Sequence, residues 1–287
     1  MPELPEVESL ARFITTQAGG QEVARAELAS FAALKTFDPP LEALRGQVLQ
    51  GAGRRGKFLT LRFADELWLV LHLARGGWLR WRDELATTRV KPSPKSPLAL
   101  RLGFTGGGGF EVTEAGTEKR LALYVVRSPD DVAGVVRLGP DPFEVDVASL
   151  GERLIAAGAS PLKAVLADQT VLAGVGNAYS DEVLHSARLS PFKPASKLSD
   201  DELTRVHGAL RSVLEDGLQR SLGLPAAGLK AEKREGLRVH GRAGLPCPVC
   251  GDIVREVSYA TKAFQYCPTC QTGGKVLADR RLSRLLR

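Results

Sequence analysis

The spacing of apolar residues divides the chain into a helical start, a long β region and a helical second half. In Val7–Gly19 the apolar residues recur every three or four positions, which predicts a helix with one buried face. From about Glu22 to Val136 the apolar runs are short, and several alternate with polar residues, as in Lys57–Phe63. The glycine run 106–109 predicts a loop or hairpin tip. Many short strands separated by Gly and Pro predict a β-sandwich or barrel.

Beyond the turn-forming segment Gly139–Pro142 the pattern becomes helical. Pro161 suits the first turn of a helix and predicts one that runs to about Ala167. After a loop, Asn177 predicts the cap of a further helix, Ala178–Arg188. A β region followed by a helical region indicates an α+β chain with more than one domain.

The last part of the chain adds a long helix and a basic, cysteine-bearing end. Ser199 and Glu202 have the spacing of a capping box and predict where the long helix begins. The charged segment Leu224–Arg234 is typical of a mobile linker. We therefore predict three domains, with residues 1–136 in a β-sandwich, 137–230 in a helical domain and 231–287 in a cysteine-bearing module.

Composition changes this picture little. A content of 44% hydrophobic and 25% charged residues is ordinary for a globular chain of 287 residues. No apolar stretch approaches the ~18 residues of a membrane-spanning helix. The N-terminal sequence MPELPE is acidic and contains no apolar run, which argues against a signal peptide. We therefore expect a cytoplasmic protein.

The net charge of +6 is concentrated near the C-terminus. Residues 230–287 contain twelve Lys or Arg and five Asp or Glu, a net charge of +7, so the first 229 residues sum to −1. A basic terminal segment favours a polyanionic partner, most often nucleic acid. On composition alone, a solubilising surface explains the charge equally well.

All four cysteines lie in this basic segment, as two Cys-x2-Cys pairs separated by sixteen residues. A β-hairpin between the pairs brings four thiolates to the corners of a tetrahedron, so Cys247, Cys250, Cys267 and Cys270 predict one Zn²⁺ site. Four thiolate ligands close the coordination sphere, so the zinc is expected to be structural. Two disulfides are less favoured in a cytoplasmic protein.

The first residues of the chain contain a pair with catalytic potential. Removal of Met1 leaves Pro2 as a free secondary amine, and an α-amino group titrates near ~8, so part of it is unprotonated at neutral pH. Such an amine attacks an aldehyde-like carbon and forms an iminium. The neighbouring Glu3 carboxyl can protonate a leaving or ring oxygen. An ordinary Met-Pro start without a catalytic role explains the same residues.

Two further segments suit phosphate binding. Lys57 follows two arginines in the sequence RRGK at the start of a strand. Gly174–Gly176, before Asn177, allow a backbone to approach a phosphate close to a helix N-terminus. His72 ends a strand near Arg75, which allows a ligand-facing role. A solvated strand end and an ordinary capped corner between helices are the alternatives.

Together these segments resemble the formamidopyrimidine-DNA glycosylase and endonuclease VIII family of base-excision repair enzymes. The resemblance runs over essentially the whole chain. It is carried by PELPEVE at 2–8, GKFL at 56–59, LHL at 71–73, LGP at 138–140, GVGNAY at 174–179 and VHGRAG at 239–244, followed by the zinc cysteines.

The resemblance implies a two-layered β-sandwich, a helix-two-turn-helix domain and a zinc-finger β-hairpin, acting as a monomer on damaged double-stranded DNA. The family flips the damaged base out of the duplex. By analogy, Pro2 attacks C1′ and Glu3 protonates the deoxyribose, and β- and δ-elimination follow through a Schiff base. The resemblance also assigns the surroundings of the lesion: Lys57, Asn177 and Lys262 to the phosphates, Lys163 to the base pocket or cleft, and Glu6 and Glu182 to the active-site floor. From its place at a strand end, we also expect His72 to contact DNA together with Arg75.

The chain departs from the family pattern in the parts that recognise the lesion. Lys262 stands where the zinc hairpin usually presents an arginine, and lysine lacks the bidentate fork. Arg75 stands where the formamidopyrimidine branch supplies a methionine wedge, and Glu118–Leu121 replace its Arg-Phe-Gly loop. We therefore expect the chemistry to be retained and the lesion specificity to be changed. A basic extension is predicted after the last cysteine, with Lys275, Arg280, Arg281, Arg284 and Arg287.

The sequence supports one main function and two alternatives. A bifunctional DNA glycosylase and abasic-site lyase accounts for Pro2, Glu3 and the zinc module together. A lesion- or structure-specific DNA-binding protein that has lost base excision is the alternative favoured by the missing wedge. An enzyme that uses an N-terminal proline as a base on small molecules leaves the zinc-bearing basic end unexplained.

Overall fold

A computed structural model describes residues 1–93, 96–259 and 262–278, without the side chains of Tyr259 and Lys262. The chain forms two compact units. The first comprises Met1–Arg137 with Ser221–Lys230, and the second comprises Leu138–Arg220 with the described part of Ala231–Arg287. The three domain ranges expected from the sequence stay a prediction.

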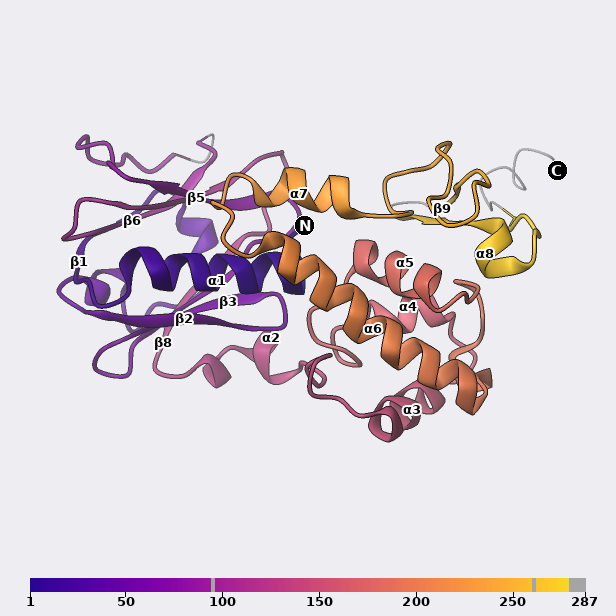
Figure 1. The fold of residues 1–287 in the computed structure, drawn as a ribbon. Helices are drawn as coiled ribbons and strands as arrows, with labels where there is room; N and C mark the ends of the chain where they lie inside the picture. Colours follow the sequence, from indigo (N-terminus) through magenta and orange to yellow (C-terminus); the bar gives the residue numbers. More distant parts are fainter. Residues whose placement is uncertain (94–95, 260–261, 279–287) are drawn as a thin grey trace. The chain divides into compact units, whose positions relative to one another are not determined.

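The first unit is a β-sandwich with an N-terminal helix, as predicted (Figure 1). One four-stranded antiparallel sheet has the order β1-β6-β7-β5, and the other has the order β2-β3-β4-β8. The strands are β1 (Val23–Leu28), β2 (Leu49–Arg55), β3 (Phe58–Phe63), β4 (Trp68–His72), β5 (Gly77–Arg82), β6 (Leu98–Phe104), β7 (Gly109–Glu114) and β8 (Ala122–Val126). The short helical elements are η1 (Phe31–Ala33), η2 (Leu41–Leu44), η3 (Pro129–Asp131) and α2 (Ala133–Val136).

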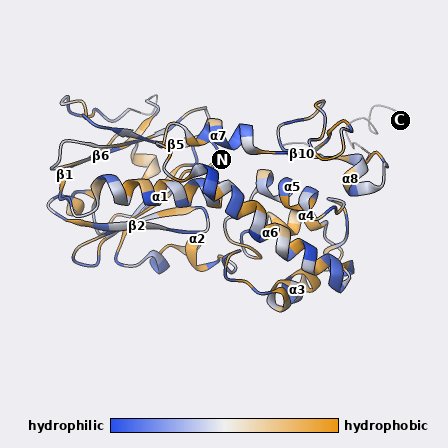
Figure 2. Cartoon of the chain, in the orientation of Figure 1, coloured by the Kyte–Doolittle hydropathy of each residue, from blue (hydrophilic) through white to orange (hydrophobic). Residues whose placement is uncertain are grey.

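Helix α1 (Leu4–Ala18) shares one apolar core with both sheets. On one side, Thr15 Oγ1 accepts a hydrogen bond from the Ala52 amide of β2 at 2.9 Å. On the other side, the Phe13 ring meets Trp81 of β5 edge to face, with 5.9 Å between centroids. The helix therefore contacts β2 and β5, which are edge strands of the two sheets. Figure 2 shows apolar and polar residues alternating along this helix, which reflects its single buried face.

The segment after residue 220 corrects one expectation. The sequence predicts a mobile linker at Leu224–Arg234, but the structure forms helix α7 (Leu229–Gly236) there. Ala226 and Leu229 are buried in the core of the first unit, at 1% and 0% exposure. The prediction is wrong because it weighed the charged residues and overlooked these two apolar ones. Trp78 of β5 also donates a hydrogen bond from Nε1 to the Ala226 carbonyl at 3.1 Å.

The second unit contains the helical region and a β-hairpin with a short helix (Figure 1). Its remaining elements are α3 (Val147–Ala156), α4 (Leu162–Leu166), α5 (Asn177–Ser186), η4 (Ala195–Lys197), α6 (Asp200–Ser221), β9 (Arg255–Tyr259), β10 (Lys262–Tyr266) and α8 (Pro268–Thr272). The predicted capping box of α6 is confirmed, because the Ser199 amide donates to Glu202 Oε2 at 2.9 Å and the Glu202 amide donates to Ser199 Oγ at 3.3 Å. None of the helices in the described ranges combines the length and apolarity needed to cross a membrane.

Candidate functional site

The N-terminal pair Pro2 and Glu3 leads directly into α1, and both residues are buried. Glu3 is the N-cap residue of the helix and has an extended backbone. The Glu3 amide donates a 2.7 Å hydrogen bond to Glu6 Oε2 in the first turn of the helix. A carboxylate in this position satisfies a helix-terminal amide and complements the helix dipole. Glu6 therefore fixes the backbone of Glu3, and its carboxylate lies next to the predicted catalytic pair Pro2 and Glu3.

Lys57 lies in the turn that joins β2 to β3, next to Gly56, which has a φ of 54°. The Lys57 side chain is only 6% exposed. An ion pair joins Arg54 Nε, near the end of β2, to Glu8 Oε2 in α1 at 3.1 Å. This contact brings the N-terminal part of α1 to the end of the sheet where the Lys57 turn lies. The structure therefore places the start of α1 and the predicted phosphate-binding turn in one region of the first unit.

His72 adjoins the Lys57 turn across the sheet. It ends β4 directly opposite Phe58 of β3, and the two rings are 4.8 Å apart at their centroids. Burial lowers the pKa of His72 below its ordinary value, and the positive charge of Lys57 lowers it further. The imidazole is therefore neutral at neutral pH. A neutral imidazole beside a lysine adds a hydrogen-bonding group without adding a second repelling charge.

Arg75 is exposed at the tip of the turn between β4 and β5. The preceding residue, Ala74, has a φ of 50°, and the Gly77 amide closes the turn on the Leu73 carbonyl at 2.9 Å. A Cβ at Gly77 would lie 2.1 Å from that same carbonyl oxygen, so only glycine fits there. This turn therefore presents Arg75 in a defined place.

The segment Glu118–Leu121, which departs from the family pattern, lies beside that turn. The Ala115 amide donates to the Gly76 carbonyl at 3.2 Å. Buried Glu114 Oε1 then accepts the amides of Arg120 at 2.7 Å and Leu121 at 2.9 Å, which pins the segment to the end of β7. The structure thus brings together the two places where the sequence lacks the expected wedge residues.

In the second unit, Asn177 is the first residue of α5 and not its cap. The cap is Gly176, whose extended backbone (φ −134°, ψ −156°) ends the preceding loop. The sequence-based assignment of Asn177 as cap is therefore wrong by one position. Its exposed side chain instead donates from Nδ2 to the Ala263 carbonyl of β10 at 2.8 Å. Asn177 thus fastens the start of α5 to the hairpin.

Lys163 of α4 is buried, and its ammonium group binds three acceptors on α5. Nζ donates to the Asn177 carbonyl at 2.9 Å and to Ser180 Oγ at 2.8 Å, and it forms an ion pair with Asp181 Oδ1 at 2.7 Å. The geometry makes Lys163 the link that holds α4 against the first turn of α5.

Two adjacent carboxylates on α5 hold the irregular segment that leads into the cysteine module. Glu182 accepts the amides of Arg238 at 2.8 Å, Val239 at 2.9 Å and His240 at 2.8 Å. Burial raises the pKa of Glu182, while these three hydrogen bonds act in the opposite direction. Asp181 Oδ2 lies 2.7 Å from His240 Nδ1 and accepts the Gln265 amide at 3.2 Å.

Sequence reasoning missed Asp181 and His240 as site residues. Local spacing does not reveal their contact, because the two residues lie 59 positions apart in the chain. Of the other predicted DNA contacts, Lys262 begins β10 opposite Tyr259, and its side chain lies outside the described part. Of the predicted basic extension, Lys275 is described, and Arg280, Arg281, Arg284 and Arg287 lie outside the described residues.

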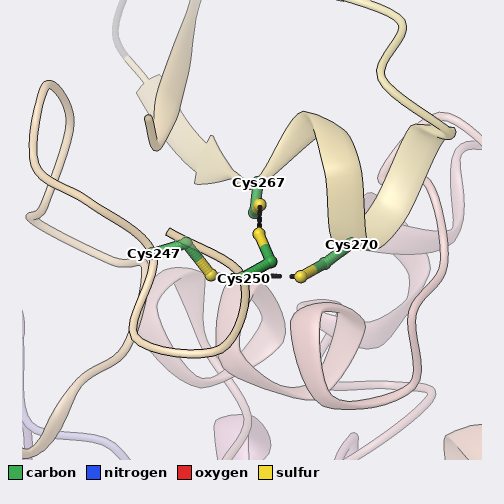
Figure 3. A group of neighbouring side chains, drawn as sticks. All are labelled: Cys247, Cys250, Cys267 and Cys270. Carbon is green, nitrogen blue, oxygen red and sulfur yellow. Dashed lines mark hydrogen bonds between the residues drawn. The ribbon is translucent and has the colours of Figure 1, made fainter. Parts of the chain in front are cut away.

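The four cysteines converge as predicted (Figure 3). Their sulfurs all lie within 4.8 Å of one another, with 3.3 Å between Cys250 and Cys267 and 3.9 Å between Cys247 and Cys270. A tetrahedral zinc ion with Zn–S bonds of ~2.3 Å requires sulfurs roughly 3.8 Å apart. A disulfide requires about 2.05 Å, and all four cysteines are free thiols. The donor set therefore fits one structural Zn²⁺, and the hairpin β9–β10 connects the two pairs.

Comparisons with known proteins agree with this arrangement. The family model described as the formamidopyrimidine-DNA glycosylase N-terminal domain matches residues 1–119, and the formamidopyrimidine-DNA glycosylase H2TH domain matches residues 138–224. A formamidopyrimidine-DNA glycosylase of Moorella thermoacetica is 34% identical over 265 residues, covering 90% of this chain and 94% of that one. The chain belongs to the formamidopyrimidine-DNA glycosylase family.

Two further members of the formamidopyrimidine-DNA glycosylase family extend the comparison. An uncharacterized formamidopyrimidine-DNA glycosylase-like protein of Mycobacterium tuberculosis is 62% identical over 150 residues, covering 52% of this chain and 94% of that one. A solved complex between Lactococcus lactis Fpg and DNA containing an abasic site aligns with a TM-score of 0.82 and 26% identity, covering 94% of this chain and 99% of that chain. The family and the fold predicted from the sequence are thus confirmed.

Proposed function

We propose that the chain is a bifunctional DNA glycosylase and abasic-site lyase that acts in base-excision repair on damaged double-stranded DNA. The observation that carries this proposal is the Pro2–Glu3 pair at the start of α1, in the same region as the Lys57 turn. Family membership supports the proposal, and so does the abasic-site DNA bound by the similar Lactococcus lactis protein.

The proposed reaction begins once Met1 has been removed, because an amide nitrogen is not a nucleophile. The lone pair of the Pro2 nitrogen attacks C1′ of the damaged nucleoside, and the base leaves with the electrons of the glycosidic bond and takes up a proton. Glu3 protonates the ring oxygen, so the sugar opens and C1′ becomes an iminium carbon. The iminium acidifies the C2′ proton, and the phosphates then leave by β- and δ-elimination. Water finally releases the sugar fragment from Pro2.

The remaining predicted residues take supporting roles in this proposal. Lys57, with neutral His72 beside it, binds a phosphate next to the lesion, and Asn177 and Lys262 bind others. Lys163 acts on the DNA through Asn177, because its ammonium group holds the Asn177 carbonyl. Glu6 and Glu182 act through the backbone segments that they fix. The zinc ion, held by the four cysteines, supplies structure and no reaction step.

We further propose that the lesion preference differs from that of the formamidopyrimidine branch. Exposed Arg75 and the neighbouring ion pair between Glu118 and Arg120, 3.1 Å long, make the inferred wedge region polar. An arginine side chain stacks on a base and donates hydrogen bonds, whereas an apolar wedge only fills the space. Oxidised pyrimidines, ring-opened purines and bare abasic sites are therefore all candidate substrates.

Borohydride trapping on a duplex with a single abasic site tests the proposed chemistry. The intact protein, with removal of Met1 verified by mass, is expected to form a covalent adduct on Pro2, and Pro2→Gly is expected to bind the same DNA without the wild-type yield of adduct. Glu3→Gln serves as the matched variant, since it retains the amine and loses the acid. Wild-type trapping by Pro2→Gly would refute the assigned nucleophile.

The polar wedge region also supports a second function, a lesion- or structure-specific DNA-binding protein without base excision. Under this alternative, the protein binds abasic or branched DNA tightly and cleaves neither strand. A protein that lacks Met1, binds abasic DNA and yields no adduct would establish the binding function in place of the enzyme.

A further inference from the structure

A histidine outside the four-cysteine set touches one of its sulfurs. His185, in the last turn of α5, places Nε2 3.3 Å from Cys247 Sγ, which is hydrogen-bonding distance for sulfur. Both side chains are buried, His185 at 3% and Cys247 at 2% exposure. The two residues are 62 positions apart, so the contact joins the helical region to the first cysteine pair.

The surroundings of the ring decide which nitrogen carries its proton. His185 Nδ1 is buried and has no hydrogen-bond partner among the described residues. A neutral imidazole has one N–H bond. With the proton on Nδ1, a buried donor would stay unsatisfied and the Nε2 lone pair would face the sulfur lone pairs. With the proton on Nε2, the N–H bond points to the sulfur and only an acceptor is left without a partner. The second arrangement is favoured.

The other sulfurs show why such a donor matters. Four thiolates around one zinc ion leave a net negative charge, which N–H groups directed at sulfur offset. The Asp252 amide donates to Cys250, and the Cys270 amide donates to Cys267. At Cys247 the donor is the side chain of His185 from helix α5.

We propose that His185 is a positioning residue of the zinc centre, donating its Nε2–H to the Cys247 thiolate. Asn177, at the other end of α5, donates to the Ala263 carbonyl at 2.8 Å. At ~1.5 Å per residue, Asn177 lies about 12 Å from His185 along the helix axis. One helix thus holds the zinc module at its metal ligand and at its hairpin. This inference rests on the zinc assignment and is independent of the glycosylase chemistry.

The test compares two variants of the full-length zinc-bound protein. His185→Phe keeps a buried aromatic ring and removes the donor, whereas His185→Gln places an amide N–H near the former Nε2 position. We expect zinc transfer to a chelating dye to be about 10-fold faster from His185→Phe, since outer partners of metal ligands change affinity by ~10–100-fold. His185→Gln is expected to restore most of the wild-type rate. In the Co²⁺-substituted proteins, only the Phe variant should shift the sulfur-to-metal charge-transfer bands.

A histidine elsewhere provides the control. His207 of α6 contacts the Val145 carbonyl at 2.9 Å through Nε2, so His207→Phe also loses a hydrogen bond but should leave zinc transfer unchanged. Wild-type transfer from His185→Phe would overturn the proposal, and so would equal acceleration in both His185 variants. A Co²⁺ spectrum with one nitrogen and three sulfur ligands would make His185 a ligand and would also overturn it. Absence of the Pro2 adduct would leave all of these readouts unaffected.

Discussion

Both units bury charged side chains, but their buried carboxylates hold backbone at different separations along the chain. In the first unit, which is built around a large apolar core, buried Glu6 and Glu114 accept backbone amides three to seven positions away. In the second unit, Asp181 and Glu182 are equally buried, at 1% and 4% exposure. They hold backbone more than fifty positions away, as the contact between Glu182 and Val239 shows.

This difference has consequences for how each unit responds to a change. An apolar core spreads its stabilisation over many contacts, so that removing one polar group at its margin costs little. Buried carboxylates and metal ligands concentrate stabilisation in a few atoms, and removing one leaves its partners unsatisfied. We therefore expect the largest single-site effects in the second unit, where such groups also join segments far apart in the chain.

Removal of the zinc ion should produce the largest effect. Structural zinc in small modules contributes apparent binding energies of about 10–16 kcal/mol, so its loss should unfold the hairpin β9–β10 and its flanking cysteine pairs. Freshly purified protein should contain one zinc per chain, and a chelator or Cys267→Ser should remove it. Hydrogen exchange should then rise in 245–259 and 262–272, measured by mass spectrometry.

The first unit supplies the internal control for that experiment. The amides of β3 and β4 lie in the sandwich and should exchange at the same rate with and without zinc. A metal content well below half an equivalent would contradict the zinc assignment. Equal loss of protection in both units would show that the second unit does not fold separately from the first.

Glu182→Gln should produce an effect of intermediate size. The amide keeps one oxygen for the three backbone N–H groups and turns its own NH2 group towards them, which leaves at least one donor unsatisfied at a cost of ~1–3 kcal/mol. Glu215→Gln is the matched control, because this exposed α6 carboxylate accepts a local bond from Gln219 at 2.7 Å and holds no distant backbone among the described residues. Chemical unfolding of the two variants measures the difference. Equal midpoints would mean that Glu182 does not hold the 238–240 segment.

The same site has a pH dependence of defined sign. Burial raises the pKa of Glu182 above its ordinary value of 4.5, so the folded protein binds the proton more tightly than the unfolded chain. The contribution of this group to stability is then fully present below the ordinary value and is lost as the pH rises through the raised one. The wild type should therefore lose part of its stability advantage over Glu182→Gln as the pH rises. An advantage that grows as the pH rises would contradict this expectation.

The comparison also explains which features the sequence could predict. Period-two and helical spacing predicted the sandwich and α1, because an apolar core selects the side of each element that faces it. The cysteine spacing predicted the four-cysteine cluster, because two short turns suffice to direct four sulfurs to one place. The contacts of Asp181 and His185 could not be predicted, and Glu182 was assigned only through the family resemblance, because their partners are set by tertiary packing and follow no local period. The linker prediction failed for the same reason, since Ala226 and Leu229 become core residues only when the fold brings the sandwich to them.

The smallest effect should come from losing the hydrogen bond between Trp78 and the Ala226 carbonyl, which holds the segment first expected to be a linker. Trp78→Phe removes the hydrogen bond to the Ala226 carbonyl and part of a ring that Lys230 Nζ faces at 4.5 Å from its centroid. The lost hydrogen bond should cost about 1 kcal/mol. The measured change should be faster hydrogen exchange in 224–230, while the β-strands of the sandwich keep their protection.

Trp81→Phe separates this role of Trp78 from simple loss of ring volume. Trp81 lies on the same strand, and its Nε1 donates to exposed Asp83 at 3.0 Å, not to the 221–230 segment. If the 221–230 segment depends on the Trp78 bond, only Trp78→Phe should loosen it, because both variants remove the same number of ring atoms. Equal loosening in both variants would mean that the apolar side chains of Ala226 and Leu229 hold the segment without help from this hydrogen bond. The Trp78 hydrogen bond would then be dispensable at the margin of the first unit, whereas we expect the Glu182 contacts to be required inside the second.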